Sequence, residues 1–369
     1  GQVIGKQYGK VLASTGNSYD KVNRAFKRNF TAIKEPLVKK EELFFASIYS
    51  SISEIDEGLW NSLLGDHAFD HIGIKFLEKY FSSLAAEDPN HMEFTYHLVK
   101  DCRGKVEALT YTSVSLWKED MLSHEIVSKK IEKIRSTDPT FLTEKVMSTG
   151  STFTEGMHVY VNNRAKNLRF LQRTFFDSIE SEFESENYGK LVFRDFTKNY
   201  FLYHTAHDRG YLVVDMPASA VFSDFEWEDL EGFENKLSKR SRRHFRSEVL
   251  PFIADFDLIV TDHLSEKELF KGYQLYLQVK ANNLYINIFE YGLGLLEAMN
   301  NRRLLQFLLL KNKGDDEIQG IVFCYLNKTN NSFNPILIGM NEEHPQRLTL
   351  YRQLLFQTIL YAKQTGISK

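Results

Sequence analysis

The spacing of apolar residues separates predicted strands from predicted helices along the chain. β-Rich runs at 93–99 and 106–116 flank a Lys-Asp-Cys-Arg-Gly-Lys turn, which predicts a hairpin with Gly104 in its turn. The other elements predicted for this half are a strand at 43–55, helices within 58–84, a polar helical insertion at 123–155, a strand at 158–161, a helix at 164–183, a strand at 190–196 and a strand pair at 201–204 and 210–216.

The same order of elements recurs in the second half, where Gly314 takes the place of Gly104. The predicted elements are a strand at 255–261, helices within 265–299, a hairpin of 304–310 and 318–327, a strand at 334–340 and a helix at 348–363. The pattern predicts an α/β (α+β) chain with two similar units, each a mixed central sheet flanked by helices and containing one strand-helix-strand crossover.

The domain division follows from this recurrence. We expect an N-terminal extension or linker at 1–41, a first domain at 42–223, a connecting acidic and basic helical segment at 224–251, and a second domain at 252–369. The second unit stops before its own crossover strand, so we expect that the native chain continues past Lys369.

Composition narrows the function classes. A length of 369 residues excludes a single small binding module, and a net charge of −3 gives no global attraction to nucleic acid or to an anionic membrane. Cys102 and Cys324 lack the spacing of a zinc site or a disulfide framework, which favours a reducing, cytoplasmic location. The longest apolar runs, such as 304–310, are too short to span a bilayer.

Several segments carry a resemblance to a known family. They are Ser-Glu-Ile-Asp-Glu-Gly-Leu-Trp-Asn-Ser-Leu at 53–63, the hairpin containing 98–101, Arg-Asp-Phe at 194–196, Leu-Ser-Lys-Arg-Ser-Arg-Arg-His-Phe-Arg at 237–246, Tyr-Leu-Gln-Val-Lys-Ala-Asn-Asn at 276–283, and Leu-Ile-Gly-Met-Asn at 337–341. In their order, from residue 42 to the end, they resemble tandem GNAT-fold acyltransferases of the FemAB-like, peptidoglycan-biosynthesis-related acyl-CoA N-acyltransferase group. The resemblance implies transfer of an acyl group from an activated donor to an amine.

The chain departs from the GNAT pattern at the loop that usually holds the cofactor pyrophosphate. Neither 162–167 nor 344–349 contains the Gln/Arg-x-x-Gly-x-Gly/Ala sequence. The donor therefore stays open among acyl-CoA, an acyl-carrier thioester and aminoacyl-tRNA. The acceptor implied by the resemblance is a small-molecule, lipid or cell-wall amine.

The start of the last predicted helix is the candidate donor site. Helix N-termini present unpaired N–H groups, and Gln346, Arg347, Leu348, Thr349 and Tyr351 surround this one. The alternative is ordinary helix initiation, with Pro345 in the first turn. Periodicity predicts that Leu348, Tyr351, Leu355 and Ala362 form the core face of this helix, where only Tyr351 can reach a ligand.

A cationic stripe on the connecting helix is the candidate site for an anionic part of the substrate. Lys239, Arg242, Arg243 and Arg246 share one helical face, and we expect this face to border a cleft between the two units. The alternative is neutralisation by six acidic residues upstream: Asp224, Glu226, Glu228, Asp229, Glu231 and Glu234. One such stripe on an acidic chain is a poor footprint for sequence-specific nucleic-acid binding.

The candidate catalytic pair lies in the helical stretch of the second unit. Glu290 is the predicted base for the acceptor amine, and Tyr276 is the predicted acid for the leaving thiolate. Tyr285 and Asn287 are candidate substrate contacts beside them, with ordinary packing as the alternative for each residue. In the first unit, Asp195 ends a predicted crossover strand, a position that opens onto ligand clefts in α/β sheets.

Three functions compete at this stage. The first is acyl transfer by direct attack in the cleft between the units, and the second is FemAB-type aminoacyl transfer to a cell-wall precursor whose diphosphate the stripe holds. The third is a non-catalytic GNAT-derived binding protein, favoured by the missing loop sequence. His204, His207 and Asp208 lack a third ligand cluster, so no metal is expected.

Overall fold

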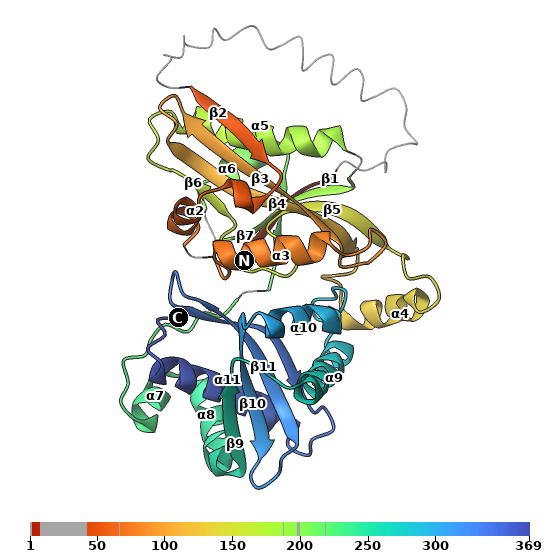
Figure 1. Cartoon of the computed structure of the whole chain (residues 1–369), viewed down its shortest axis with the longest axis vertical. Coiled ribbons are helices and arrows are strands. Elements are labelled where there is room, and N and C mark those ends of the chain that lie inside the picture. Colours follow the sequence, from red (N-terminus) through yellow and green to blue (C-terminus); the bar gives the residue numbers. More distant parts are fainter. Residues whose placement is uncertain (1, 8–42, 66, 187, 198–199, 218) are drawn as a thin grey trace.

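The computed structural model describes residues 2–7, 43–65, 67–186, 188–197, 200–217 and 219–369 (Figure 1). The first half contains β1 (Gln2–Gln7), β2 (Phe44–Tyr49), α2 (Glu57–Leu63), α3 (His71–Ser82), β3 (Met92–Asp101), β4 (Val106–Lys118), α4 (Glu125–Arg135), β5 (Thr143–Thr149), β6 (Val159–Val161), α5 (Leu168–Ser185), β7 (Lys190–Phe196), α6 (Tyr203–Asp208) and β8 (Leu212–Asp215). The second contains α7 (Leu230–Lys236), α8 (Lys239–Glu248), β9 (Phe256–Thr261), α9 (Glu266–Asn282), α10 (Leu293–Asn301), β10 (Leu305–Asn312), β11 (Ile318–Asn327), β12 (Ser332–Met340) and α11 (Arg347–Gln364).

Each half of the chain builds one sheet, and helices flank both sheets (Figure 1). The first sheet has the order β2-β3-β4-β5-β7-β1-β8, with β6 as a further partner of β4, and it is mixed because β5 and β7 run parallel. The second has the order β12-β11-β10-β9, and its described strands are all antiparallel. The α/β class predicted from the sequence is confirmed. The mixed sheet and the crossover predicted for the second unit are wrong for the described residues, because no strand follows α11 to pair in parallel with β12.

Both predicted hairpins are present, and glycine makes their turns possible. Gly104 joins β3 to β4 at φ 81°, and Gly314 joins β10 to β11 at φ 76°. A side chain at either position would be strained by this left-handed backbone conformation. The alternating or continuous apolar pattern of the four strands then fixes their register on the two sheets.

Three predictions about elements are wrong. The insertion at 123–155 contains the strand β5 as well as a helix, because pairing with β4 and β7 outweighs the weak strand signal of Thr-Glu-Lys-Val-Met-Ser-Thr. The predicted strand at 201–204 runs into helix α6, whose aromatic residues suggested a strand. Residues 2–7 form β1 between β7 and β8 instead of a linker, and the rest of the predicted extension lies outside the described residues.

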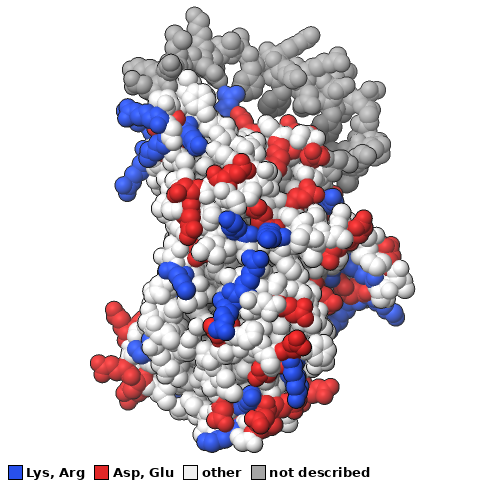
Figure 2. Space-filling view, viewed as in Figure 1, with Lys and Arg blue, Asp and Glu red and all other residues white. Residues whose placement is uncertain are grey.

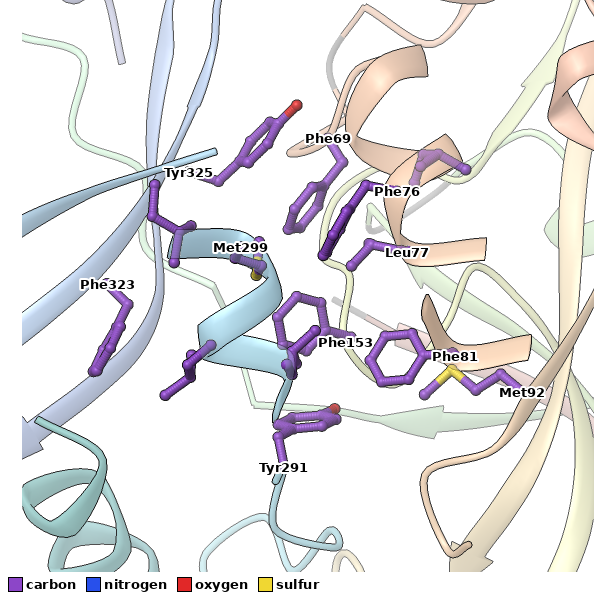
Figure 3. Close-up of a cluster of buried hydrophobic side chains, with 14 of the residues drawn as sticks. Phe69, Phe76, Leu77, Phe81, Met92, Phe153, Tyr291, Met299, Phe323 and Tyr325 are labelled. Carbon is purple, nitrogen blue, oxygen red and sulfur yellow. The ribbon is translucent and has the colours of Figure 1, made fainter. Parts of the chain in front are cut away.

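One apolar core is shared by the two units (Figure 3). The ring centroids of Phe153 and Tyr291 lie 4.8 Å apart, and those of Phe69 and Tyr325 lie 4.4 Å apart. The Tyr325 hydroxyl also donates to Asp70 Oδ1 at 2.7 Å. Side chains from the two halves therefore fill the junction at which we expected a cleft.

Candidate functional site

The parallel strands β5 and β7 separate after three residue pairs. Pairing ends at Ser148 and Val192, and the chain turns away at Gly150, where φ is 75°. A Cβ at Gly150 would lie 2.5 Å from the His158 ring, so only glycine fits this turn. The guanidinium of Arg194 donates to the carbonyl oxygens of Ser151 and Thr154, so a side chain of the protein bridges the space between the diverging strands.

A buried polar chain lies at this divergence. His158 Nε2 lies 2.9 Å from Asp195 Oδ2, and His158 Nδ1 lies 2.7 Å from His67 Nε2. Both histidines are fully buried, whereas the Asp195 side chain is 19% exposed. Asp195 has φ 59°, a left-handed conformation that aspartate tolerates better than most residues. The cluster therefore ends in one partly accessible carboxylate.

The charges of the cluster follow from burial and partners. Burial raises the pKa of Asp195, but the Arg194 charge and the hydrogen bond from His158 outweigh it and leave a pKa of about 2. Burial, with the neighbouring His158 ring, lowers the pKa of His67 to about 3. Burial also lowers the pKa of His158. At neutral pH the cluster holds one carboxylate and two neutral rings.

The ionised Asp195 sets the tautomer of His158 and, through it, that of His67. Because Asp195 is ionised, His158 Nε2 carries the proton and donates to it, which leaves His158 Nδ1 to accept from His67 Nε2. His67 Nδ1 lies 3.0 Å from the backbone nitrogen of Phe69, whose N–H it then accepts, and 2.8 Å from the Phe69 carbonyl oxygen. Arg194 Nη2 also lies 3.5 Å from Asp195 Oδ2, and the part of the carboxylate that stays exposed could contact a second cation, such as an ammonium group.

Of this cluster, sequence analysis found Asp195 and missed both histidines. His67 lies in the loop before α3 and His158 at the start of β6, separated by 91 residues, and neither stands in a local motif. The irregular segment between β5 and β6 places His158 next to His67. A local sequence signal for the pair was therefore lacking.

The predicted donor site at the start of α11 borders an open hollow of about 470 Å³. The hollow is lined by Ala254, Asp255, Phe256, Asn312, Lys313, His344, Pro345 and Gln346. His344 Nδ1 accepts the backbone N–H of Gln346 at 3.1 Å, and His344 Nε2 lies 3.2 Å from Asn312 Oδ1. Gln346 thus lies at the hollow, and Lys313 adds a cation that sequence reasoning missed.

The other predicted residues of α11 divide between surface and core. Arg347 Nη1 donates to Glu342 Oε2 at 2.5 Å, and Thr349 is buried. Leu348 and Tyr351 are exposed, as is Leu355, so the prediction that these three form the core face is wrong. The buried face is rotated from them around the helix axis. It contains Leu350, Gln353, Leu354 and Gln357, together with the predicted Ala362.

The predicted catalytic pair lies in the second unit. The Tyr276 hydroxyl accepts the backbone N–H of Tyr291 at 3.1 Å, and burial raises its pKa, which keeps it protonated at neutral pH. Glu290 is exposed and adjoins Tyr291 in sequence. Tyr276 thus contacts the backbone next to Glu290, and Gln278, two residues further along α9, accepts the backbone N–H of Glu342, the partner of Arg347 at the start of α11.

The two predicted substrate contacts beside Glu290 differ sharply in environment. Tyr285 is 68% exposed, whereas Asn287 is buried. Asn287 Nδ2 donates to Asp120 Oδ2 at 2.8 Å and to Glu132 Oε1 at 2.7 Å, and Asn287 Oδ1 accepts from Lys118 Nζ at 3.3 Å. Asn287 therefore joins the second unit to α4 and the end of β4.

The basic stripe lies on α8, on the side of the second unit away from the first (Figure 1). Arg242 donates to the backbone carbonyls of Glu234, Asn235 and Leu237, and Arg246 forms an ion pair with Glu234. The expectation that the stripe borders a cleft between the units is wrong, because α7 folds back on α8. Figure 2 shows cations and acids interspersed over the visible face.

Two further properties of the described residues bear on function. They contain no group of three or more His, Cys, Asp or Glu side chains able to hold a metal ion. Within the same residues, a helix of the length and apolar character needed to cross a membrane is not found.

Comparison with known proteins gives distant structural likenesses. No family model and no curated protein matches the chain. The chain is similar to a solved structure of L-PGS from Bacillus licheniformis, with 12% identity, a TM-score of 0.45, and coverage of 84% of this chain and 72% of that one. It is also similar to a GCN5-related glucosamine N-acetyltransferase region in a fungal multi-domain GH3 β-N-acetylglucosaminidase, with 10% identity and a TM-score of 0.38. That likeness covers 91% of this chain and 35% of the other.

Proposed function

We propose that the chain is an acyltransferase that moves an acyl group from an activated donor to an amine, and that the second unit binds the donor. The observation that carries the proposal is the order β9, α9, α10, β10, β11, β12, α11 around an antiparallel sheet, with an open hollow where α11 begins. This is the order of the GNAT fold that the sequence resembles, as far as the crossover helix α11. The N–H groups of Gln346 and Arg347 are bonded to His344, so the N–H groups of Leu348 and Thr349 are the ones at the start of α11 that suit an anionic donor.

Acyl transfer requires that donor and acceptor be positioned together and that one proton pass from the amine to the thiolate. The amine nitrogen attacks the acyl carbonyl carbon, the carbon–sulfur bond of the thioester breaks, and the proton lost by the amine balances the one gained by the thiolate. We assign the base to Glu290, whose carboxylate is exposed, and the acid to Tyr276, which stays protonated at neutral pH. Acyl-CoA and acyl-carrier thioesters are the donors that fit this scheme, with aminoacyl-tRNA as the alternative.

The first unit supports a second candidate role, the binding of a cationic group. The Arg194 side chain bridges the gap between the diverging strands β5 and β7. Because this gap is occupied, we favour ligand binding over acyl transfer as the role of the first unit. Asp195 offers a carboxylate held ionised by Arg194 and His158. An ammonium or guanidinium group of an acceptor is the ligand that this carboxylate suits.

Replacing Arg347 with glutamate should weaken binding of a CoA thioester by about 1 to 3 kcal/mol, because a charge-assisted hydrogen bond is lost. Glu342 is the matched control, since Glu342→Gln removes the partner of Arg347 without reversing a charge. We expect Glu342→Gln to bind the thioester at least as tightly as the unaltered chain. Isothermal titration of the three proteins measures both effects, and identical curves for Arg347→Glu and the unaltered chain would exclude this donor site.

A further inference from the structure

Helix α4 projects from the molecule near the level at which the two units meet (Figure 1), and its faces are inverted relative to a normal surface helix. The side that packs on the protein is polar. Arg135 donates to Asp120 Oδ1 and to Glu132 Oε1, each at 2.6 Å, and Glu132 accepts from Lys118 Nζ at 2.8 Å. Amphipathic surface helices normally turn their apolar side chains inward and their charges outward.

The outer face of α4 carries the apolar side chains instead. Ile126 is 61% exposed, Ile134 is 44% exposed, and Val127 lies beside them. Leu122 before the helix and Leu142 after it are exposed as well. We call these five residues the α4 patch. Several exposed aliphatic side chains on one protruding helix and its flanking residues indicate an interaction site for an apolar surface.

The backbone at Leu142 independently indicates that this surface is specified by the fold. Leu142 has φ 48°, a left-handed conformation that is strained for a leucine. Its carbonyl accepts the Glu119 N–H at 2.9 Å and Arg135 Nη2 at 2.9 Å, so the ion-pair network under α4 holds the strained turn. The leucine side chain is nevertheless 46% exposed.

The exposed lysines of α4 indicate which kind of surface the α4 patch contacts. Lys129, Lys130 and Lys133 are exposed on α4, and Lys129 forms an ion pair with Glu125 at 2.6 Å, while the other acid of the helix, Glu132, faces Lys118 and Arg135. Lysines around aliphatic residues suit an anionic lipid surface, since the side chains insert while the ammonium groups reach the headgroups. Pairing of two α4 patches would bring these lysines close together, which like-charge repulsion disfavours.

We propose that the α4 patch docks the protein on the surface of an anionic lipid bilayer without crossing it. The aliphatic side chains enter the interface, and Lys130 and Lys133 contact the anionic headgroups. This role is independent of the proposed acyl transfer, because α4 contains none of the residues assigned to donor or catalysis.

Flotation of the full chain with vesicles tests the proposal. We expect binding to vesicles that contain phosphatidylglycerol, little binding to pure phosphatidylcholine, and weakening as salt rises because exposed charges are screened. Ile126→Glu/Ile134→Glu should lower the partition coefficient at least tenfold. Lys130→Gln/Lys133→Gln should lower it about 25-fold, since each lysine near an anionic surface contributes about fivefold.

The controls make the same kinds of change, each at a single position, on α9. Phe270 is 51% exposed there and Lys267 is exposed, so Phe270→Glu and Lys267→Gln should bind like the unaltered chain. Absence of binding to anionic vesicles, or equal loss in the α9 controls, would overturn the proposal. So would vesicle-free dimerisation in light scattering that the isoleucine variant abolishes, because the patch would then join two copies. Unchanged circular dichroism of the variants is required, and the lysine pair serves if the isoleucine pair unfolds.

Discussion

Lowering the pH from 7.5 to 5 is expected to reduce the free energy of unfolding by about 2 kcal/mol through His67 alone. Burial and the His158 ring hold the pKa of His67 at about 3 in the folded chain, against 6.5 for the free side chain. Below pH 6.5 the unfolded chain binds a proton that the folded chain does not. Stability is therefore complete above pH 6.5 and falls by about 1.4 kcal/mol per pH unit as the pH drops toward 3.

His158 adds to this effect in the same direction, because burial lowers its pKa too. Asp195 extends the loss to stronger acid: its pKa of about 2 lies below the ordinary 3.8, so its contribution is present above pH 3.8 and disappears as the pH falls toward 2. The same carboxylate is the proposed cation-binding group. Acid should therefore weaken the fold around it before it is protonated.

Urea unfolding at several pH values measures the slope. His67→Gln should flatten the dependence between pH 6 and 4.5 by about 1.4 kcal/mol per pH unit, whatever its effect on stability at pH 7.5. His207→Gln is the control, because that side chain is 84% exposed and should leave the slope unchanged. Equal slopes for the unaltered chain and His67→Gln would show that His67 is not held neutral by burial.

Replacing Phe153 with alanine should cost about 3 to 5 kcal/mol of unfolding free energy, the range for a buried phenylalanine. The Phe153 ring lies edge-on to Tyr291 at 4.8 Å and 5.7 Å from Phe81, so one cavity opens against both units (Figure 3). Because the two units share this core, the change should destabilise both of them.

Phe45 provides the matched control, since it is 56% exposed on β2 and its replacement by alanine should change stability by less than about 0.5 kcal/mol. Urea unfolding of both variants is followed by tryptophan fluorescence. Trp60 and Trp117 lie in the first unit, and Trp227 of the connecting segment lies in the same core cluster as Phe356 of the second. A Phe153→Ala chain as stable as Phe45→Ala would contradict a shared core.

The sequence predicts most elements because local pattern and turn chemistry agree in them. The hairpins around Gly104 and Gly314 show this well, since apolar strands and a left-handed glycine indicate the same structure. β5 shows the limit: its polar sequence becomes a strand only between two partners that are distant in the chain. Pairing between strands that are distant in the chain gives no recognisable pattern in the local sequence.

The candidate sites were predictable to a smaller degree. Asp195 and Gln346 could be found because strand ends and helix starts are recognisable in sequence. His67 and His158 meet only through the fold, and the fate of Arg246 depends on where α7 turns. For Leu348 and Leu355, helical spacing alone did not identify which face of α11 meets the sheet.

The most direct test of the proposed acyl transfer is the amine-dependent release of thiol from a thioester, with the acylated amine identified by mass spectrometry. Acyl-CoA, acyl-carrier thioester and aminoacyl-tRNA are offered in turn, with ester cleavage as the readout for the last. We expect an acylated amine with one donor class, a loss of about 100-fold in turnover for Glu290→Gln, and little change for the exposed control Glu297→Gln on α10. A folded chain that yields no acylated amine from any of the three donors would contradict the proposed acyl transfer.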